Sequence, residues 1–179
     1  DPAILRAYLE ITGLKSLPRT GWLRRGVSPD DCESVADHTL GVAALCLLLL
    51  DGRGLDRGKV LHMAVLHDLG EARVGDLTPD DGVSSADKHR LEAEAVQGIV
   101  GDLGVGERHL VIWQEYEDGA TPDARFLRQV DKLEMALQAA AYEQQGYEGM
   151  GEFFDSARGA IEDADLLAIL DAVSPVLSR

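Results

Sequence analysis

The sequence of 179 residues contains only two cysteines, Cys32 and Cys46. Two cysteines cannot form the disulfide framework that stabilises small secreted domains, and a chain of this length does not need one. Cys46 lies within an apolar run, which is typical of a buried free thiol. We therefore expect a protein of a reducing compartment, with a cytoplasmic location.

Basic residues are scarce as well: 17 Lys and Arg face 32 Asp and Glu, which gives a formal net charge of −15 at pH 7. Nucleic-acid polymers and anionic membranes bind to basic surfaces, so this balance argues against both as partners. Long apolar runs are also missing. The most apolar stretch, 42–50, has about half of the ~18 residues that a membrane span requires, and no signal-peptide pattern is present. We expect a soluble protein.

Segments of alternating polarity, internal repeats and linkers are absent too, which argues against a sheet or a second domain. At roughly 150 residues per domain, the length predicts one domain that spans residues 1–179. Apolar residues recur at helical spacing, so we predict an all-α fold. The expected helices cover about 4–13, 35–50, 57–69, 87–103, 107–117, 122–145 and 163–177. Irregular segments at 15–33 and 70–86 are long enough to predict a functional role.

Three of the predicted helices carry polar side chains on or beside faces that are otherwise apolar. His38 is followed by apolar residues four, seven and eleven positions later, all on one helical face. His67 and Asp68 straddle the apolar stripe of their helix, and Asp131 flanks that of the longest one. Each has an ordinary structural explanation: a hydrogen-bonded core histidine, a local cap or a salt bridge to Arg73, and an acid at the solvent border. Together they predict two histidines and two aspartates that meet between three helices.

Two imidazoles and two carboxylates form a donor set that suits Mn²⁺, Co²⁺, Fe²⁺, Ni²⁺ or Zn²⁺. Four protein ligands leave coordination positions open for water, and an ion held in this way activates water and polarises a phosphoryl oxygen. We therefore predict one divalent transition-metal ion at His38, His67, Asp68 and Asp131. The sequence does not determine which of the five metals it is.

Acidic and basic residues are unevenly distributed around this set. Glu71 and Asp76 follow the second histidine closely enough to hold or donate a proton beside the ion. Segment 11–29 contains no acidic residue but has four basic residues and a tryptophan, among them Arg19 and Trp22. This composition is typical of a pocket for a phosphate and a flat ring. A loop tied to neighbouring acids by salt bridges would have the same composition.

The order of these residues resembles the H…HD…D signature of the HD-domain metal-dependent phosphohydrolases. Longer strings are more specific than the signature itself. LPRTGW, ESVADHT, HDLGEARVGDLTP, KHRLEAEA and DKLEMALQAAAYE are similar to the YfbR-like group of HD-domain 5′-deoxynucleotidases. The similarity runs from about residue 14 to the last predicted helix and so covers most of the chain.

This resemblance implies a single-domain HD-domain helical bundle that hydrolyses deoxyribonucleoside 5′-monophosphates to deoxyribonucleosides and phosphate. It also implies a small-molecule nucleotide as substrate and a homodimer, because family members commonly dimerise. Residue by residue, it implies metal ligation by His38, His67, Asp68 and Asp131, catalysis by Glu71 and Asp76, and phosphate binding by Arg19. Trp22 is a candidate for stacking on the base or sugar, although two residues separate it from Arg19, whereas in some members a tryptophan directly follows the arginine.

Two other interpretations use the same residues. Another HD phosphohydrolase, acting on cyclic nucleotides, (p)ppGpp or dNTPs, would share the metal ligands. A nucleotide- or metal-binding module without catalysis would keep the pocket but release no product. The release of phosphate, pyrophosphate or triphosphate from a nucleotide panel distinguishes these functions.

Overall fold

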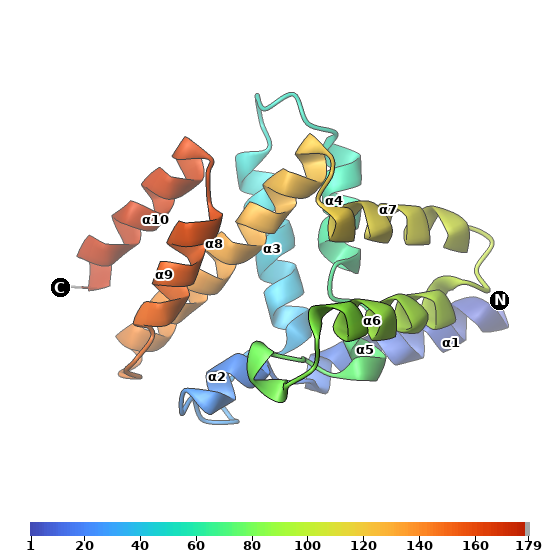
Figure 1. Cartoon of the computed structure of the whole chain (residues 1–179), viewed down its shortest axis with the longest axis horizontal. Helices are drawn as coiled ribbons and strands as arrows, with labels where there is room; N and C mark the ends of the chain where they lie inside the picture. The colour runs from blue at the N-terminus through green and yellow to red at the C-terminus, as the bar shows by residue number, and fades with distance from the viewer. Residues whose placement is uncertain (178–179) are drawn as a thin grey trace.

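The computed structural model describes residues 1–177, which contain ten α-helices, two short 3₁₀ helices and no β-strand (Figure 1). The predicted all-α fold is therefore confirmed. The α-helices are α1 (Pro2–Ile11), α2 (Thr20–Arg24), α3 (Val35–Leu49), α4 (Arg57–Leu66), α5 (Glu71–Val74), α6 (Ser85–Val100), α7 (Gly106–Asp118), α8 (Pro122–Gln144), α9 (Gly151–Ala160) and α10 (Ala164–Leu177); the 3₁₀ helices are η1 (Thr12–Ser16) and η2 (Pro79–Asp81). No helix in the described range is long and apolar enough to cross a membrane.

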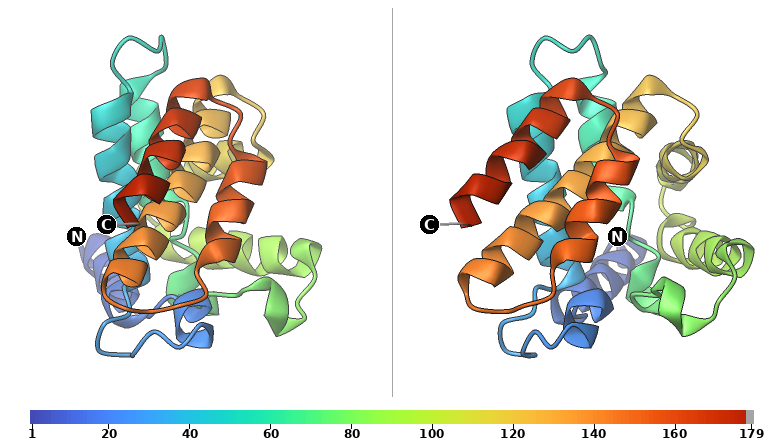
Figure 2. Two further views of the ribbon diagram at one scale, coloured as in Figure 1. Left: turned by 90° about the vertical axis from the view of Figure 1, so that its left-hand side faces the viewer. Right: turned by 60° about the vertical axis from the view of Figure 1, so that its left-hand side comes forward.

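Helices α3, α4 and α8 form the centre of the molecule and pack against one another. Helices α9 and α10 cover one side of α8 (Figures 1 and 2). On the other side, α7 packs against α4 and α8, and α6 packs against α7. The central helices meet through fully buried side chains such as Val42, Met63 and Leu127. Cys46 belongs to the same core, and burial raises the pKa of its thiol to about 12. This confirms the expected buried thiol.

Helix α3 begins at a well-defined cap that fixes where its first turn lies. The hydroxyl of Ser34 accepts from the backbone N–H of Asp37, and the Asp37 carboxylate accepts from the backbone N–H of Ser34. This reciprocal pairing satisfies donors that a helix start would otherwise leave free. An isolated bridge between Pro18 and Ser34 ties the preceding loop to the same point. The cap therefore holds both His38 and the segment after Pro18 at one end of the central helices.

Helix α4 is shorter than predicted, and this changes the setting of the His67–Asp68 pair. The helix ends at Leu66 with His67 as its C-cap, so Asp68 lies in the turn beyond it. The expectation that Asp68 occupies the last turn of the helix is therefore wrong. Trp113 donates from its ring nitrogen to the His67 carbonyl at 3.3 Å, which satisfies an acceptor at the early helix end.

Gly70, the residue after the predicted helix 57–69, precedes α5 as its N-cap, with φ −59°. Its role is close packing rather than an unusual backbone conformation. A side-chain carbon at this position would lie 3.1 Å from the backbone of Glu92 in α6. The turn between α4 and α5 therefore lies directly against α6.

The two segments expected to be irregular contain short helices. Segment 15–33 includes α2 and the end of η1, and segment 70–86 includes α5 and η2. Helix α9 was not predicted; it has ten residues, two of them glycines, which have low helix propensity. The other long helices begin and end within a few residues of the predicted limits.

Candidate metal centre and active site

Four predicted ligand residues come from three separate parts of the central bundle. His38 lies in the first turn of α3, His67 and Asp68 follow α4, and Asp131 lies in the middle of α8. Both imidazoles are buried, at 1 % and 4 % exposure. The His67 ring is oriented locally, because its Nδ1 lies 2.8 Å from the Ala64 carbonyl and can donate to it. That hydrogen bond leaves Nε2 of His67 free to face His38 and Asp68.

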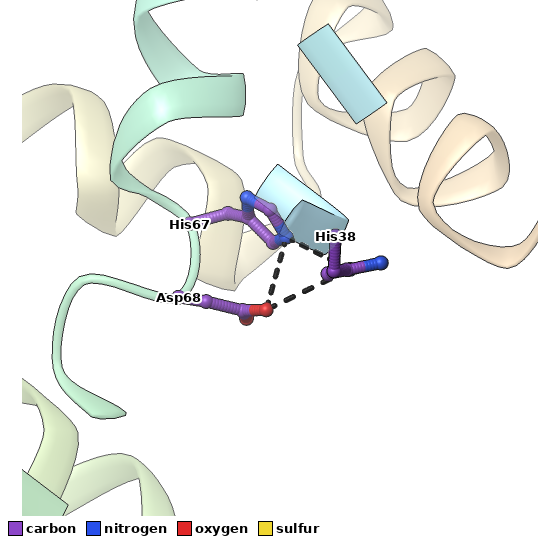
Figure 3. A group of neighbouring side chains, drawn as sticks. All are labelled: His38, His67 and Asp68. Atoms are coloured by element: carbon purple, nitrogen blue, oxygen red, sulfur yellow. Dashed lines mark hydrogen bonds and ion pairs between the residues drawn. The ribbon is translucent and has the colours of Figure 1, made fainter. Parts of the chain in front are cut away.

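The ring nitrogens and the Asp68 carboxylate converge on one point (Figure 3). Nε2 of His67 lies 3.4 Å from Nε2 of His38 and 3.2 Å from Oδ2 of Asp68. Nε2 of His38 lies 3.7 Å from the same Asp68 oxygen. Asp131 extends the group, since its Oδ1 lies 3.1 Å from Nε2 of His38. The structure thus brings together the four residues that the sequence singled out.

The donor atoms of this group suit a metal ion. One ligand atom each from His38, His67 and Asp68 lie within 4.8 Å of one another, and Asp131 joins at the edge through its contact with His38. Metal–ligand bonds of about 2.0–2.2 Å place neighbouring ligands roughly 3 Å apart. Oδ2 of Asp68 is buried and has no hydrogen-bond donor, and an unpartnered buried carboxylate oxygen is costly. A cation at this point would remove that cost.

The charges within the group show how strongly it attracts positive charge. Burial opposes a charged His38, but its hydrogen bonds to Asp131 and Glu134 outweigh burial and raise its pKa to about 10. Burial likewise opposes the charged form of Asp68, yet His67 and Arg19 hold its pKa below the ordinary value. Both shifts show that the carboxylates of this group attract positive charge.

Glu71 and Asp76 lie beside this group but differ in their hydrogen bonding. Glu71, at the start of α5, is 3 % exposed, and its Oε2 has no partner. Burial and the charge of Asp68 raise the pKa of Glu71 to about 10. Both oxygens of Asp76 are occupied: Oδ1 accepts from Arg19 at 3.1 Å and Oδ2 accepts from the backbone N–H of Thr20 at 2.5 Å.

Arg19 lies between the candidate ligands and the two acids. Its backbone N–H donates to the Glu33 carbonyl at 3.0 Å, so the bridge at the start of α3 positions it. Its Nη1 lies 3.6 Å from Asp68 and 3.8 Å from Glu71, in addition to its bond to Asp76. Burial opposes its charge, but these carboxylates outweigh burial and raise the pKa of Arg19 above its ordinary value. A charged guanidinium therefore stands beside the candidate metal centre.

A cavity of about 700 Å³ opens over this arrangement. Phe153 and Met135 contribute apolar surface to its wall, and Lys88 on α6 contributes a second cation. The Lys88 ammonium donates to the Leu77 carbonyl at 2.9 Å. Neither Phe153 nor Met135 has a local signal in the sequence, and Lys88 is marked only by its place in the cationic run KHR. The cavity offers a charged end for an anion and an apolar wall for a ring.

Trp22 lines the cavity, but most of its indole is covered. The residue is 2 % exposed, its ring nitrogen donates to Glu33 at 2.7 Å, and the Phe153 ring lies 4.2 Å from it between centroids. Its neighbours Arg24 and Arg25 are engaged with acids on other segments, Asp81 and Glu152. These two arginines therefore match the second interpretation of segment 11–29, a loop held in place by salt bridges to neighbouring acids.

Comparisons with known proteins give one consistent result. A family model described as HD domain matches residues 11–172. The chain is 40% identical over 167 residues to "5′-deoxynucleotidase HDDC2" of Dictyostelium discoideum, covering 85% of this chain and 87% of that protein. It is 34% identical over 171 residues to the human protein of the same name, covering 93% and 82% respectively. These similarities confirm the resemblance drawn from the sequence motifs.

Solved structures agree with the sequence comparison. A protein from Pyrococcus horikoshii superposes with a TM-score of 0.80 at 35% identity, over 94% of this chain and 97% of that chain. A structure from Magnetospirillum magnetotacticum, described as a predicted metal-dependent phosphohydrolase, has a TM-score of 0.76 at 26% identity, covering 99% and 92%. The helical arrangement is therefore shared along almost the whole chain.

Proposed function

This chain belongs to the HD domain family, and from that membership we propose that it is a metal-dependent 5′-deoxynucleotidase. Such a phosphoric monoester hydrolase converts a deoxyribonucleoside 5′-monophosphate to a deoxyribonucleoside and phosphate. The observation that carries the proposal is the buried His38–His67–Asp68 group, with its unpartnered Asp68 oxygen, beside Arg19 in one cavity. We propose that all of residues 1–179 form one HD phosphohydrolase domain.

We propose that His38, His67, Asp68 and Asp131 hold one divalent transition-metal ion. Two neutral nitrogen donors with two carboxylates suit Mn²⁺, Co²⁺, Fe²⁺, Ni²⁺ or Zn²⁺. When bound, such an ion supplies Lewis acidity toward a phosphate oxygen and activates water for attack at neutral pH. The acidic surroundings repel a phosphate dianion unless positive charge is supplied, so this site requires a cation for substrate binding.

Arg19 is the proposed phosphate-binding residue. Its planar guanidinium can donate two parallel hydrogen bonds to phosphate oxygens, which gives both attraction and orientation. Asp76 holds Nη1 of Arg19 from the side, at 3.1 Å, and is itself fixed by the backbone of Thr20. Lys88 adds a second positive charge on the cavity wall. The phosphate is therefore held at the charged end of the cavity.

We propose different roles for the two acids, Glu71 and Asp76, because their hydrogen bonds differ. Asp76 already accepts a hydrogen bond at each oxygen, so its role is to orient Arg19. Glu71 has a buried oxygen without a partner and is free to hold or transfer a proton. As the water oxygen bonds to phosphorus and the bond from phosphorus to the 5′ oxygen breaks, Glu71 supplies a proton to that oxygen, and the proton that the water loses restores the Glu71 carboxyl group.

The nucleoside is expected to lie along the apolar wall of the cavity. Phe153 and Met135 are partly exposed there, whereas Trp22 lies behind Phe153. Aromatic rings of this kind stack on a base or pack against a sugar face. We propose that Trp22 contributes to nucleoside binding mainly by supporting the position of Phe153.

We propose that the chain forms a homodimer through the outer face of α3. Leu40, Leu47 and Leu48 are 69%, 50% and 78% exposed and follow one helical face together with Ala44. Apolar stripes of this kind on helices are usually covered by a partner.

We also propose a cytoplasmic location. The cysteines Cys32 and Cys46 are free, which is typical of a reducing compartment.

A nucleotide panel tests the proposed reaction. Purified protein reconstituted with Mn²⁺ or Co²⁺ is incubated separately with dNMPs, NMPs, dNTPs, cyclic nucleotides and (p)ppGpp, and products are resolved by chromatography. We expect phosphate and a deoxyribonucleoside from dNMPs. Pyrophosphate or triphosphate release, or a ring-opened product, would assign the site to another HD phosphohydrolase reaction. Binding without any product would support a module without catalysis.

A further inference from the structure

Glu134 is a buried carboxylate that the proposed reaction does not use. It lies three residues after Asp131 on α8, on the same side of the helix, and is 7 % exposed. Its Oε2 lies 2.5 Å from Nδ1 of His38, on the side of the imidazole opposite Nε2. Acidic side chains are rarely buried unless they have a specific partner. The partner here is one of the proposed metal ligands.

In the neutral imidazole that binds a metal, this contact determines which nitrogen of His38 carries the proton. A carboxylate accepts from Nδ1–H and so keeps the proton on that nitrogen, which leaves the Nε2 lone pair available for a metal. A carboxylate oxygen of Glu33 also lies within 4.8 Å of the ligand atoms of His38 and Glu134. Its carboxylate already accepts from the Trp22 ring nitrogen at 2.7 Å. Glu134 is therefore the acceptor that orients His38.

Gly41 makes the contact possible. It lies on α3 three residues after His38, and a side-chain carbon there would be 2.2 Å from Oε1 and 2.9 Å from Cδ of Glu134. Glycine within a helix is less favourable than alanine, because it loses more backbone freedom on folding. Because Gly41 has no side chain, the Glu134 carboxylate can approach the α3 backbone closely.

We infer that Glu134 is a positioning residue for metal binding, and that Gly41 provides the space for it. The inference rests on the proposed metal-dependent function. Glu134 holds the His38 ring in the tautomer and orientation that point Nε2 at His67 and Asp68. Its loss weakens metal binding without removing any ligand.

Two substitutions of similar size separate this role from simple packing. Glu134→Gln keeps an oxygen that can accept from Nδ1–H, whereas Glu134→Met fills the space without an acceptor. Glu143→Gln, farther along α8, is the matched control. The measurements are the dissociation constant for Mn²⁺ by calorimetry and the ¹⁵N-edited NMR signal of the His38 Nδ1–H proton in metal-free protein.

We expect Glu134→Met to lose the downfield Nδ1–H signal and to bind Mn²⁺ about 10- to 100-fold more weakly. Glu134→Gln should retain the signal and most of the affinity, and Glu143→Gln should match wild type. If Glu134→Met binds Mn²⁺ as tightly as wild type, the positioning role is wrong while the metal site stands. If wild type itself binds no Mn²⁺, Zn²⁺ or Co²⁺, both the site and this inference fail.

Gly41→Ala tests the same contact from the other side. The added methyl displaces the Glu134 carboxylate, so we expect weaker Mn²⁺ binding although alanine favours helix formation. Gly159→Ala in α9 is the control, because a side chain there meets nothing within 4 Å. Unchanged Mn²⁺ affinity in folded Gly41→Ala would contradict the role assigned to Gly41.

Discussion

Asp76 holds Arg19 in place across 57 residues of sequence. One carboxylate oxygen accepts from Nη1 of Arg19 at 3.1 Å, and the other accepts from the backbone N–H of Thr20 at 2.5 Å. The contact joins the two segments, 15–33 and 70–86, that the sequence analysis left largely without helices. Both segments line the cavity over the candidate metal centre. The orientation of the proposed phosphate-binding guanidinium therefore depends in large part on this carboxylate.

Replacement of Asp76 by alanine should impair substrate binding while the metal stays bound. A hydrogen bond to a charged group is worth about 1.5–3 kcal/mol, so we expect kcat/KM for a dNMP to fall roughly 10- to 100-fold. Phosphate-release kinetics and metal analysis of the same preparation check this. Loss of the metal in proportion to activity would contradict the assigned role, because it would make Asp76 a support of the ligand set.

Glu71→Gln should affect the chemical step instead. The variant keeps the shape of the side chain but cannot transfer a proton from a carboxyl group. Proton transfer by a positioned group contributes about 10²- to 10⁴-fold, so we expect kcat to fall by that factor with little change in metal content. A variant that retains the wild-type kcat would exclude Glu71 as the proton donor.

Leu48→Glu should dissociate the proposed homodimer. Leu48 is 78% exposed on the outer face of α3, so the substitution removes no core contact within the chain. A charge inside an apolar interface is costly, whereas on a free surface it is tolerated. We expect light scattering after gel filtration to give a dimer for wild type and a monomer for the variant. A monomeric wild-type protein would refute the proposed dimer.

The pair formed by His62 and His109 predicts a dependence of stability on pH. Nε2 of His62 lies 2.7 Å from Nδ1 of His109, and burial lowers the pKa of both below the ordinary 6.5, with the His109 charge adding to the effect on His62. The unfolded chain therefore binds these protons more tightly. The contribution of the pair is complete above the unfolded pKa and decreases as the pH falls through it toward the folded values.

His109→Gln removes one titrating group from this pair. Urea unfolding from about pH 7 down to about pH 5 should show a smaller loss of unfolding free energy in the variant than in wild type. Equal losses in both proteins would contradict the role of the pair. The mutual hydrogen bond of His62 and His109 gives both histidines a structural role.

Helical periodicity was sufficient to predict the central helices and the residues that meet between them. His38 was identified because it continues an apolar face of α3, and Asp131 because it flanks one on α8. Local signals were weaker where tertiary contacts decide the structure. The early end of α4 depends on packing against α6 and on Trp113, neither of which is visible in the local sequence of α4.

Some roles could not be predicted because they depend on contacts between residues that are far apart in the sequence. Nothing local distinguishes Glu134 from a solvated acid on α8, since its partner His38 is 96 residues away. Trp22 was a reasonable candidate for an exposed stacking residue, yet Phe153, 131 residues further along the chain, covers it. Gly41 likewise appears as an ordinary helical glycine until α8 is placed against α3.

The metal content of the protein, measured together with its activity, tests the central claim most directly. Mass spectrometry of wild type and of Asp68→Ala should find a divalent transition metal in the first and little in the second. Chelation of wild type should abolish phosphate release from dNMPs, and added Mn²⁺ or Co²⁺ should restore it. Undiminished phosphate release from thoroughly metal-free protein would contradict the account.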